Sequence, residues 1–85
     1  MFINKTNRGL NNICGNNVKT YRKEINISQR QFADKLQLDG LDIDKNAIQR
    51  IEAGKRFVTD IELAVLSKVL QKSYDELLKI DSENE

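Results

Sequence analysis

The chain has 85 residues and a formal net charge of +1, which suits one small domain with a single core and excludes a large enzyme with a separate lid. It has no His and one Cys, Cys14, so the residues behind most zinc sites and covalent catalysis are missing, and we expect neither an enzyme nor a cofactor. Cys14 has no partner for an internal disulfide, and no apolar run resembles a membrane span or a signal peptide. We therefore expect a cytoplasmic protein without membrane contact.

The charge is unevenly placed along the chain. Residues 1–56 hold 11 Lys or Arg against 6 Asp or Glu, a net +5, and residues 57–85 hold 3 against 7, a net −4, which together give +1. A basic part beside an acidic part suits a module that binds a charged surface such as nucleic acid. Chance placement on solvated helix faces is the alternative explanation.

The first 13 residues differ in composition from the rest. They contain five Asn or Gly and few apolar residues, so we expect a flexible N-terminal arm at 1–13, before a domain at 14–80. Lys5 and Arg8 in this arm offer positive charge to a phosphate backbone, although a frayed terminus would have the same composition.

The first helix is predicted at about residues 16–25. Side chains recur there at the three-and-four spacing of one helix face, at Val18, Tyr21, Arg22 and Ile25. Asn26 follows as a residue that tolerates the left-handed backbone at which helices often end.

Three capping boxes predict where later helices begin. Each places Ser or Thr three residues before Gln or Glu, so that two side chains satisfy free amides of the first helical turn. They predict helices that begin near residues 29, 60 and 74, and the pairs are Ser28 with Gln31, Thr59 with Glu62, and Ser73 with Glu76.

Apolar stripes define four helices after the first. The second, at 29–37, has Phe32, Ala33 and Leu36; the third, at 44–53, has Ala47, Ile48 and Ile51 and is closed by Gly54; the fourth has Leu63, Leu66 and Leu70; the short fifth has Leu77 and Leu78. A polar, acidic tail follows at 81–85. The chain is thus predicted to be all-α, with five short helices and no strands.

The stretch "LDGLDIDKNAIQRIE", residues 38–52, allows two interpretations. The spacing of Asp42, Asp44 and Asn46 is that of the first calcium ligands of an EF-hand. However, the sixth and twelfth positions of such a loop are Ala47 and Ala53, where the turn glycine and the closing glutamate are required. We therefore predict no metal site, and Asp44 is expected to cap the start of the third helix.

The third helix carries its polar side chains on the face opposite its apolar stripe. These side chains belong to Lys45, Asn46, Gln49 and Arg50. Arg or Lys can bind guanine, and Asn or Gln can bind adenine, in the major groove of DNA. An ordinary solvated face is the alternative for the helix taken alone.

Most of the chain resembles the lambda-repressor-like helix-turn-helix family, also called Cro/C1-type or XRE-type. The resemblance runs from Asn16 to Leu78 and rests on "VKTYRKEINISQRQFADKL", "IDKNAIQRIEAGKR" and "TDIELAVLSKVLQKSYDELL", in that order and spacing. It implies a compact bundle of five helices in which the second and third form the helix-turn-helix.

The resemblance also implies roles for particular residues. Contacts to DNA bases fall to Lys45, Asn46, Gln49 and Arg50, and contacts to DNA phosphates fall to Ser28, Gln29, Lys55 and Arg56. Arg22 and Glu52 match a partly buried structural ion pair between the first and third helices.

Two features depart from the common family pattern. The turn between the second and third helices is lengthened by "QLDGLDID", in which Ile43 is expected to take the apolar position while Asp39 and Asp42 point away from DNA. Gln71 and Lys72 replace the usual Gly and apolar residue before the last helix, so the packing of that corner is not predicted.

The resemblance implies a sequence-specific protein that binds double-stranded DNA, a small transcriptional regulator or repressor that acts as a homodimer. We expect the fourth and fifth helices to form the dimer surface, with Val65, Val69 and Tyr74, unless these residues belong to the core. The alternative is an antitoxin or adaptor whose main partner is a protein, docked on the acidic "SYDELLKIDSENE".

Overall fold

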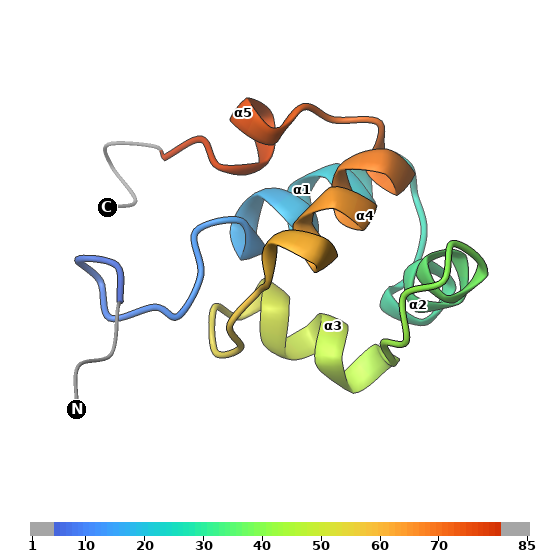
Figure 1. Ribbon diagram of the computed structural model, residues 1–85, viewed down its shortest axis with the longest axis horizontal. Helices are drawn as coiled ribbons and strands as arrows, with labels where there is room; N and C mark the ends of the chain where they lie inside the picture. The colour runs from blue at the N-terminus through green and yellow to red at the C-terminus, as the bar shows by residue number, and fades with distance from the viewer. Residues whose placement is uncertain (1–4, 81–85) are drawn as a thin grey trace.

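The computed structural model describes residues 5–80, which contain five α-helices joined by loops and no strands (Figure 1). The helices are α1 (Gly15–Glu24), α2 (Gln29–Leu38), α3 (Lys45–Glu52), α4 (Asp60–Leu70) and α5 (Tyr74–Leu77). The all-α prediction is confirmed, with α2 and α3 as the helix-turn-helix. The expected acidic tail at 81–85 and the first four residues of the expected arm lie outside the described residues.

The helices begin where the capping residues predicted. Ser28, Thr59 and Ser73 each accept a hydrogen bond from the backbone of the residue three positions on, and the Gln or Glu at that position bonds back in each case. Asp44 caps α3, because its Oδ1 accepts from the Ala47 amide at 2.8 Å. The aspartate that imitates a calcium ligand by its spacing is therefore used to start a helix.

Four helices end at a residue with left-handed backbone, as the sequence predicted at two of these positions. These residues are Asn26, Gly40, Gly54 and Gln71, with φ between 56° and 89°. After α3, the Gly54 amide bonds the Ile51 carbonyl and the Lys55 amide bonds the Arg50 carbonyl. This is the Schellman pattern, which turns the chain sharply at the end of α3.

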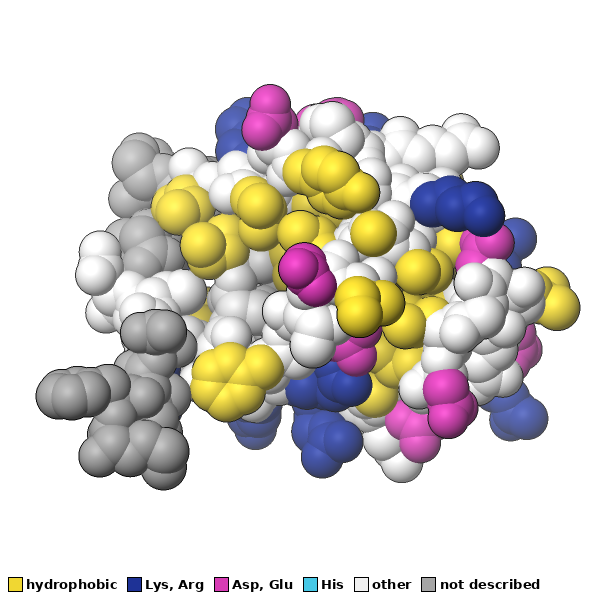
Figure 2. Space-filling view, in the orientation of Figure 1, with side chains coloured by type: hydrophobic (Ala, Val, Ile, Leu, Met, Phe, Trp, Pro, Cys, Tyr) yellow, Lys and Arg dark blue, Asp and Glu magenta, His cyan; other side chains and the backbone are white. Residues whose placement is uncertain are grey.

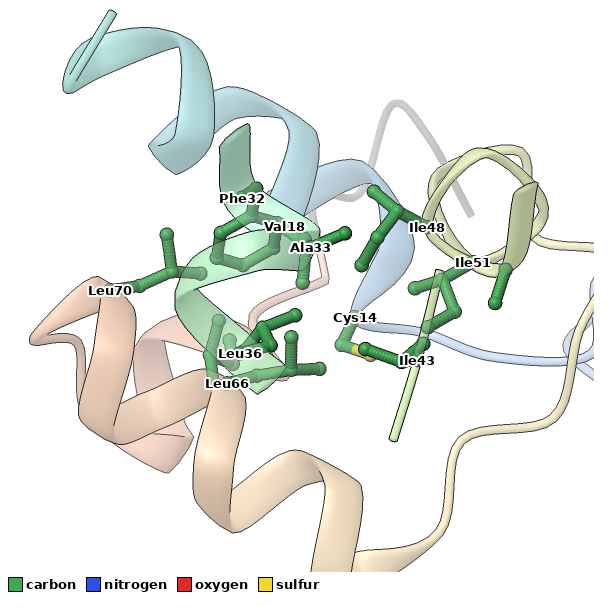
Figure 3. Close-up of a cluster of buried hydrophobic side chains, with 12 residues drawn as sticks. Cys14, Val18, Phe32, Ala33, Leu36, Ile43, Ile48, Ile51, Leu66 and Leu70 are labelled. Atoms are coloured by element: carbon green, nitrogen blue, oxygen red, sulfur yellow. The ribbon is translucent and has the colours of Figure 1, made fainter. Parts of the chain in front are cut away.

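The core lies where α1, α2, α3 and α4 meet, and Figure 3 shows its buried side chains directed toward one another. The largest fully buried side chains are those of Phe32, Leu36, Ile48, Ile51, Leu66, Leu77 and Val18. Burial of each side chain contributes about 1.5–3 kcal/mol to folding stability through removal from water.

Burial also raises the pKa of the Cys14 thiol to about 11, so the thiol is protonated and unreactive at neutral pH.

The lengthened turn between α2 and α3 folds back onto the domain. Ile43 is buried in the core and takes the apolar position that the sequence predicted (Figure 3). The Gln37 side chain donates to the Ile43 carbonyl at 2.8 Å, and the Asp39 carboxylate pairs with Lys68 of α4 at 3.0 Å. This surface pair adds little stability, but it fixes the direction of Asp39 toward α4.

The corner between α4 and α5 is held by contacts that the sequence did not predict. Gln71 adopts the left-handed conformation usual for glycine, and the Lys72 ammonium lies 4.7 Å from the centre of the Tyr21 ring. The Asn17 side chain donates to the carbonyls of Leu77 and Lys79 at 2.7 and 2.9 Å. These contacts tie the end of α5 to α1.

Part of the segment expected to be a free arm is attached to the domain. Residues 6–10 form a turn closed by hydrogen bonds between Thr6 and Leu10, and Asn11 and Asn12 bond the loop that follows α3. Residues 10–12 thus contact the bundle, although the sequence was predicted to have its domain at 14–80. Over residues 5–80, none of the helices combines the length and apolar character that crossing a membrane requires.

Candidate nucleic-acid interface

The helix α3 has a buried face and an exposed polar face. Ala47, Ile48 and Ile51 are buried in the core. The four residues predicted to read bases are all exposed to solvent, and they are Lys45, Asn46, Gln49 and Arg50. The division of faces that the sequence predicted is thus present, and the polar face is available to a partner.

Most of these side chains border one shallow hollow on the surface. It measures about 510 Å³ and is lined by Asp44, Asn46, Gln49, Arg50, Ala53 and Lys55. Lys55 comes from the loop after α3, and the Schellman turn at Gly54 brings it beside the helix. The hollow therefore joins three predicted base contacts to one predicted phosphate contact, while Lys45 lies outside its lining.

Basic side chains lie along the lower edge of Figure 2, where α3 lies, with acidic side chains beside them at the right, and apolar side chains gather over α4. The basic part of this edge is suited to a polyanion.

The N-terminus of α2 was predicted to bind phosphate through Ser28 and Gln29. The Ser28 hydroxyl caps the helix, and the Gln29 side chain donates to Glu52 Oε1 at 3.0 Å. Both side chains therefore already have hydrogen-bond partners within the protein. The first amides of a helix have no partner within it, so an anion here would bind the backbone amides of Gln29 and Arg30.

The predicted ion pair between α1 and α3 is present. Arg22 Nε lies 2.7 Å from Glu52 Oε2, and Arg22 Nη2 donates to Glu52 Oε1 at 3.0 Å. The two side chains are only 9% and 3% exposed. The hydrogen bonds that Arg22 donates to Glu52 raise the pKa of Arg22, and the third donor to this carboxylate is Gln29 of α2. One carboxylate thus fixes α3 relative to both α1 and α2.

Arg56 has a role that the sequence analysis did not anticipate. Its Nη1 and Nη2 donate to the two carboxylate oxygens of Glu62 at 3.0 and 2.9 Å, and Nη1 also donates to the Phe57 carbonyl. This pair raises the pKa of Arg56 and lowers that of Glu62. Arg56 joins the loop to α4, so a phosphate contact by this residue remains a prediction that requires the pair to open.

Two residues near the interface escaped the sequence analysis altogether. Asn11 and Asn12 hold the backbone of the loop that carries Lys55. The sequence analysis did not assign them a role, because a stretch rich in asparagine is typical of a flexible terminus.

Across the described residues, no group of three or more acidic or Cys side chains is placed to hold a metal ion.

A capped helix, a turn and a second helix with an exposed polar face and a basic loop at its end form a DNA-binding helix-turn-helix domain. The helix-turn-helix family of the Cro/C1 type matches residues 18–77, more than half of the chain, and the chain belongs to this family. The match lies within the residues 16–78 on which the resemblance rested. No curated protein and no solved structure matches the chain.

Proposed function

We propose that this protein binds double-stranded DNA in a sequence-specific manner and acts as a small transcriptional regulator or repressor. The observation that carries the proposal is the polar face of α3, where three donor-rich side chains and Lys55 border one hollow. A helix presented in this way fits the major groove.

The proposed contacts divide into two kinds. Asn46, Gln49 and Arg50, with Lys45 beside them, read base edges, and each good bidentate contact discriminates by about 1–3 kcal/mol. Lys55 and the amides at the start of α2 bind phosphates and set the register without reading sequence. Asp39 fits this docking, because its carboxylate is held by Lys68 of α4.

A selection of bound duplexes from a random pool tests the function. Enrichment of a common motif that survives competition by unrelated DNA supports specific binding, and no enrichment contradicts it. Lys55→Ala should weaken binding to the selected duplex and to unrelated DNA alike. It should also reduce the slope of binding against salt concentration by about one, since one phosphate contact is lost. The matched control is Lys19→Ala, which removes an exposed lysine of α1 outside the proposed contacts and should leave the slope unchanged.

A single α3 covers few base pairs, so we also propose that the protein acts as a homodimer on paired half-sites. Val65 and Val69 pack partly against the core, so the dimer surface is supported by Tyr74 and by two further exposed apolar side chains of α4 and the end of α5. Ile61 is 72% exposed, and Tyr74 and Leu78 are 52% and 41% exposed. Sedimentation of the chain and of Ile61→Lys tests this: a monomer both free and on the selected duplex contradicts the dimer.

A protein partner is the second candidate, in the manner of an antitoxin or adaptor. Residues 57–85 have a net charge of −4 in the sequence, which favours a basic partner, and α4 and α5 expose the apolar side chains of Ile61 and Tyr74. Docking of such a partner needs no DNA and should survive Arg50→Ala. Loss of the partner in that variant would contradict a separate protein surface.

A further inference from the structure

Two adjacent asparagines before α1 hold the loop after α3 almost entirely through its carbonyl groups. The Asn11 amide donates to the Gly54 carbonyl at 2.8 Å, and Asn11 Nδ2 donates to the Lys55 carbonyl at 2.8 Å. Asn12 Nδ2 donates to the carbonyls of Ile51 at 3.1 Å and Arg56 at 2.7 Å. We call Asn11 and Asn12 the asparagine latch.

The latch holds the backbone of Lys55, and the same residue lines the hollow. The Lys55 carbonyl is held by Asn11, while its side chain lines the hollow together with Asn46, Gln49 and Arg50. Holding the carbonyl sets the backbone orientation of Lys55 and hence the direction in which its side chain leaves the loop.

The latch also orients the carbonyl groups of the loop after α3. A carbonyl oxygen carries partial negative charge, which repels phosphate. Donors from the asparagine latch bind the carbonyls of Ile51, Gly54, Lys55 and Arg56. The loop can then present its ammonium group to an anion with its carbonyl oxygens turned to the protein.

An apolar contact completes the attachment. A Cβ added at Gly54 would lie 2.9 Å from Leu10 Cδ2, so Leu10 packs directly over the glycine. The segment at residues 10–12 therefore covers the loop on one side, by packing at Gly54 and by hydrogen bonds on either side of it.

The hydrogen bond that the Asn11 side chain donates is set against an unpaired acceptor on the same side chain. Asn11 Oδ1 is buried and has no hydrogen-bond partner among the described residues. A buried acceptor without a partner opposes folding and offsets the gain from the donor bond of the same side chain. Truncation of Asn11 should therefore change folding stability little, which allows its effect on binding to be measured separately.

We propose that Asn11 and Asn12 are positioning residues that set Lys55 against the DNA backbone. The inference rests on the proposed DNA binding and deepens it. The segment before α1 then contributes to the interface through Lys55, although it makes no contact with DNA itself.

A double-variant cycle on the selected duplex tests the latch. Asn11→Ala should weaken binding about three- to tenfold, both to the selected duplex and to unrelated DNA, and lower the salt slope toward that of Lys55→Ala. In the Lys55→Ala background, Asn11→Ala should have no further effect. Asn12→Ser is the second variant, because its hydroxyl can still accept from the Gly15 amide but cannot donate to both carbonyls.

Asn17→Ala is the matched control. Asn17 also donates to two backbone carbonyls, but on the segment after α5, so its loss should affect folding stability and leave the salt slope unchanged. Unchanged affinity in both latch variants overturns the proposal, as does an equal loss in the Lys55→Ala background. If Lys55→Ala weakens binding and the latch variants do not, the positioning role of Asn11 and Asn12 is contradicted and the DNA contact of Lys55 is not. If the chain binds no DNA, both the positioning role and the proposed function are contradicted.

Discussion

Gly15→Ala should destabilise the protein, although alanine is normally the better residue in a helix. Gly15 is the buried first residue of α1, and a Cβ built there would lie 2.0 Å from the Ile51 carbonyl oxygen and 2.7 Å from Asn12 Oδ1. Ordinary contact of a Cβ begins near 3.4 Å, so α1 would have to move away from α3 by about 1.4 Å, the difference from 2.0 Å. The glycine is therefore required by the close approach of the two helices.

The size of the effect follows from what such a shift disturbs. Overpacking costs about 1–3 kcal/mol, and the bonds that Asn12 makes to the Ile51 carbonyl and the Gly15 amide contribute about 1 kcal/mol each. Helix propensity returns about 0.5–1 kcal/mol. The net loss is about 2–4 kcal/mol, out of a total stability of about 4–13 kcal/mol for a chain of this length.

Urea unfolding of Gly15→Ala and Gly40→Ala measures this directly. Gly40 is the matched control, because its φ is +89° and an added Cβ would meet no described atom within 4 Å. Its substitution costs backbone strain alone, about 1 kcal/mol. A Gly15→Ala protein as stable as the parent, or more stable than Gly40→Ala, would refute the close contact between α1 and α3.

Three further predictions concern single contacts. Glu52→Gln leaves the buried Arg22 without its opposite charge and should cost about 3–5 kcal/mol in urea unfolding at neutral pH, and a loss below 1 kcal/mol would contradict a buried pair. Glu62→Gln keeps the capping box but loses the pair with Arg56; since the folded-state pKa of Glu62 is lowered, the parent should have the higher Tm above pH 4.5, and this advantage should vanish as the pH falls through that lowered pKa. A Tm difference that does not vary with pH would exclude this linkage. Gln71→Gly relieves a left-handed φ of 56° and should stabilise the fold by about 0.5–1 kcal/mol, visible as a higher Tm.

The sequence predicted the parts of this structure that depend on neighbours along the chain. Capping boxes located the starts of α2, α4 and α5, because their hydrogen bonds span three residues. Helical periodicity separated the buried Ile48 from the exposed Arg50 for the same reason. The family resemblance added the pair between Arg22 and Glu52, which periodicity could not have supplied.

The contacts that were missed join residues far apart in sequence. Asn12 reaches Ile51 and Arg56, 39 and 44 residues away, and no local pattern marks it. Arg56 was assigned to phosphate from its position in a basic loop, but the capping box at α4 places the Glu62 carboxylate beside it. A side chain with two candidate partners, one inside the protein and one on DNA, cannot be assigned from the chain alone.

Selection of duplexes by the parent protein and by an Asn46→Ala, Arg50→Ala double variant tests the central claim most directly. These residues are exposed on α3, so the double variant should remain folded. We expect the parent to enrich an inverted repeat, and the variant to lose preference at the same positions of each half-site while it still binds DNA through its phosphate contacts. The same enriched bases in both proteins would contradict reading by α3.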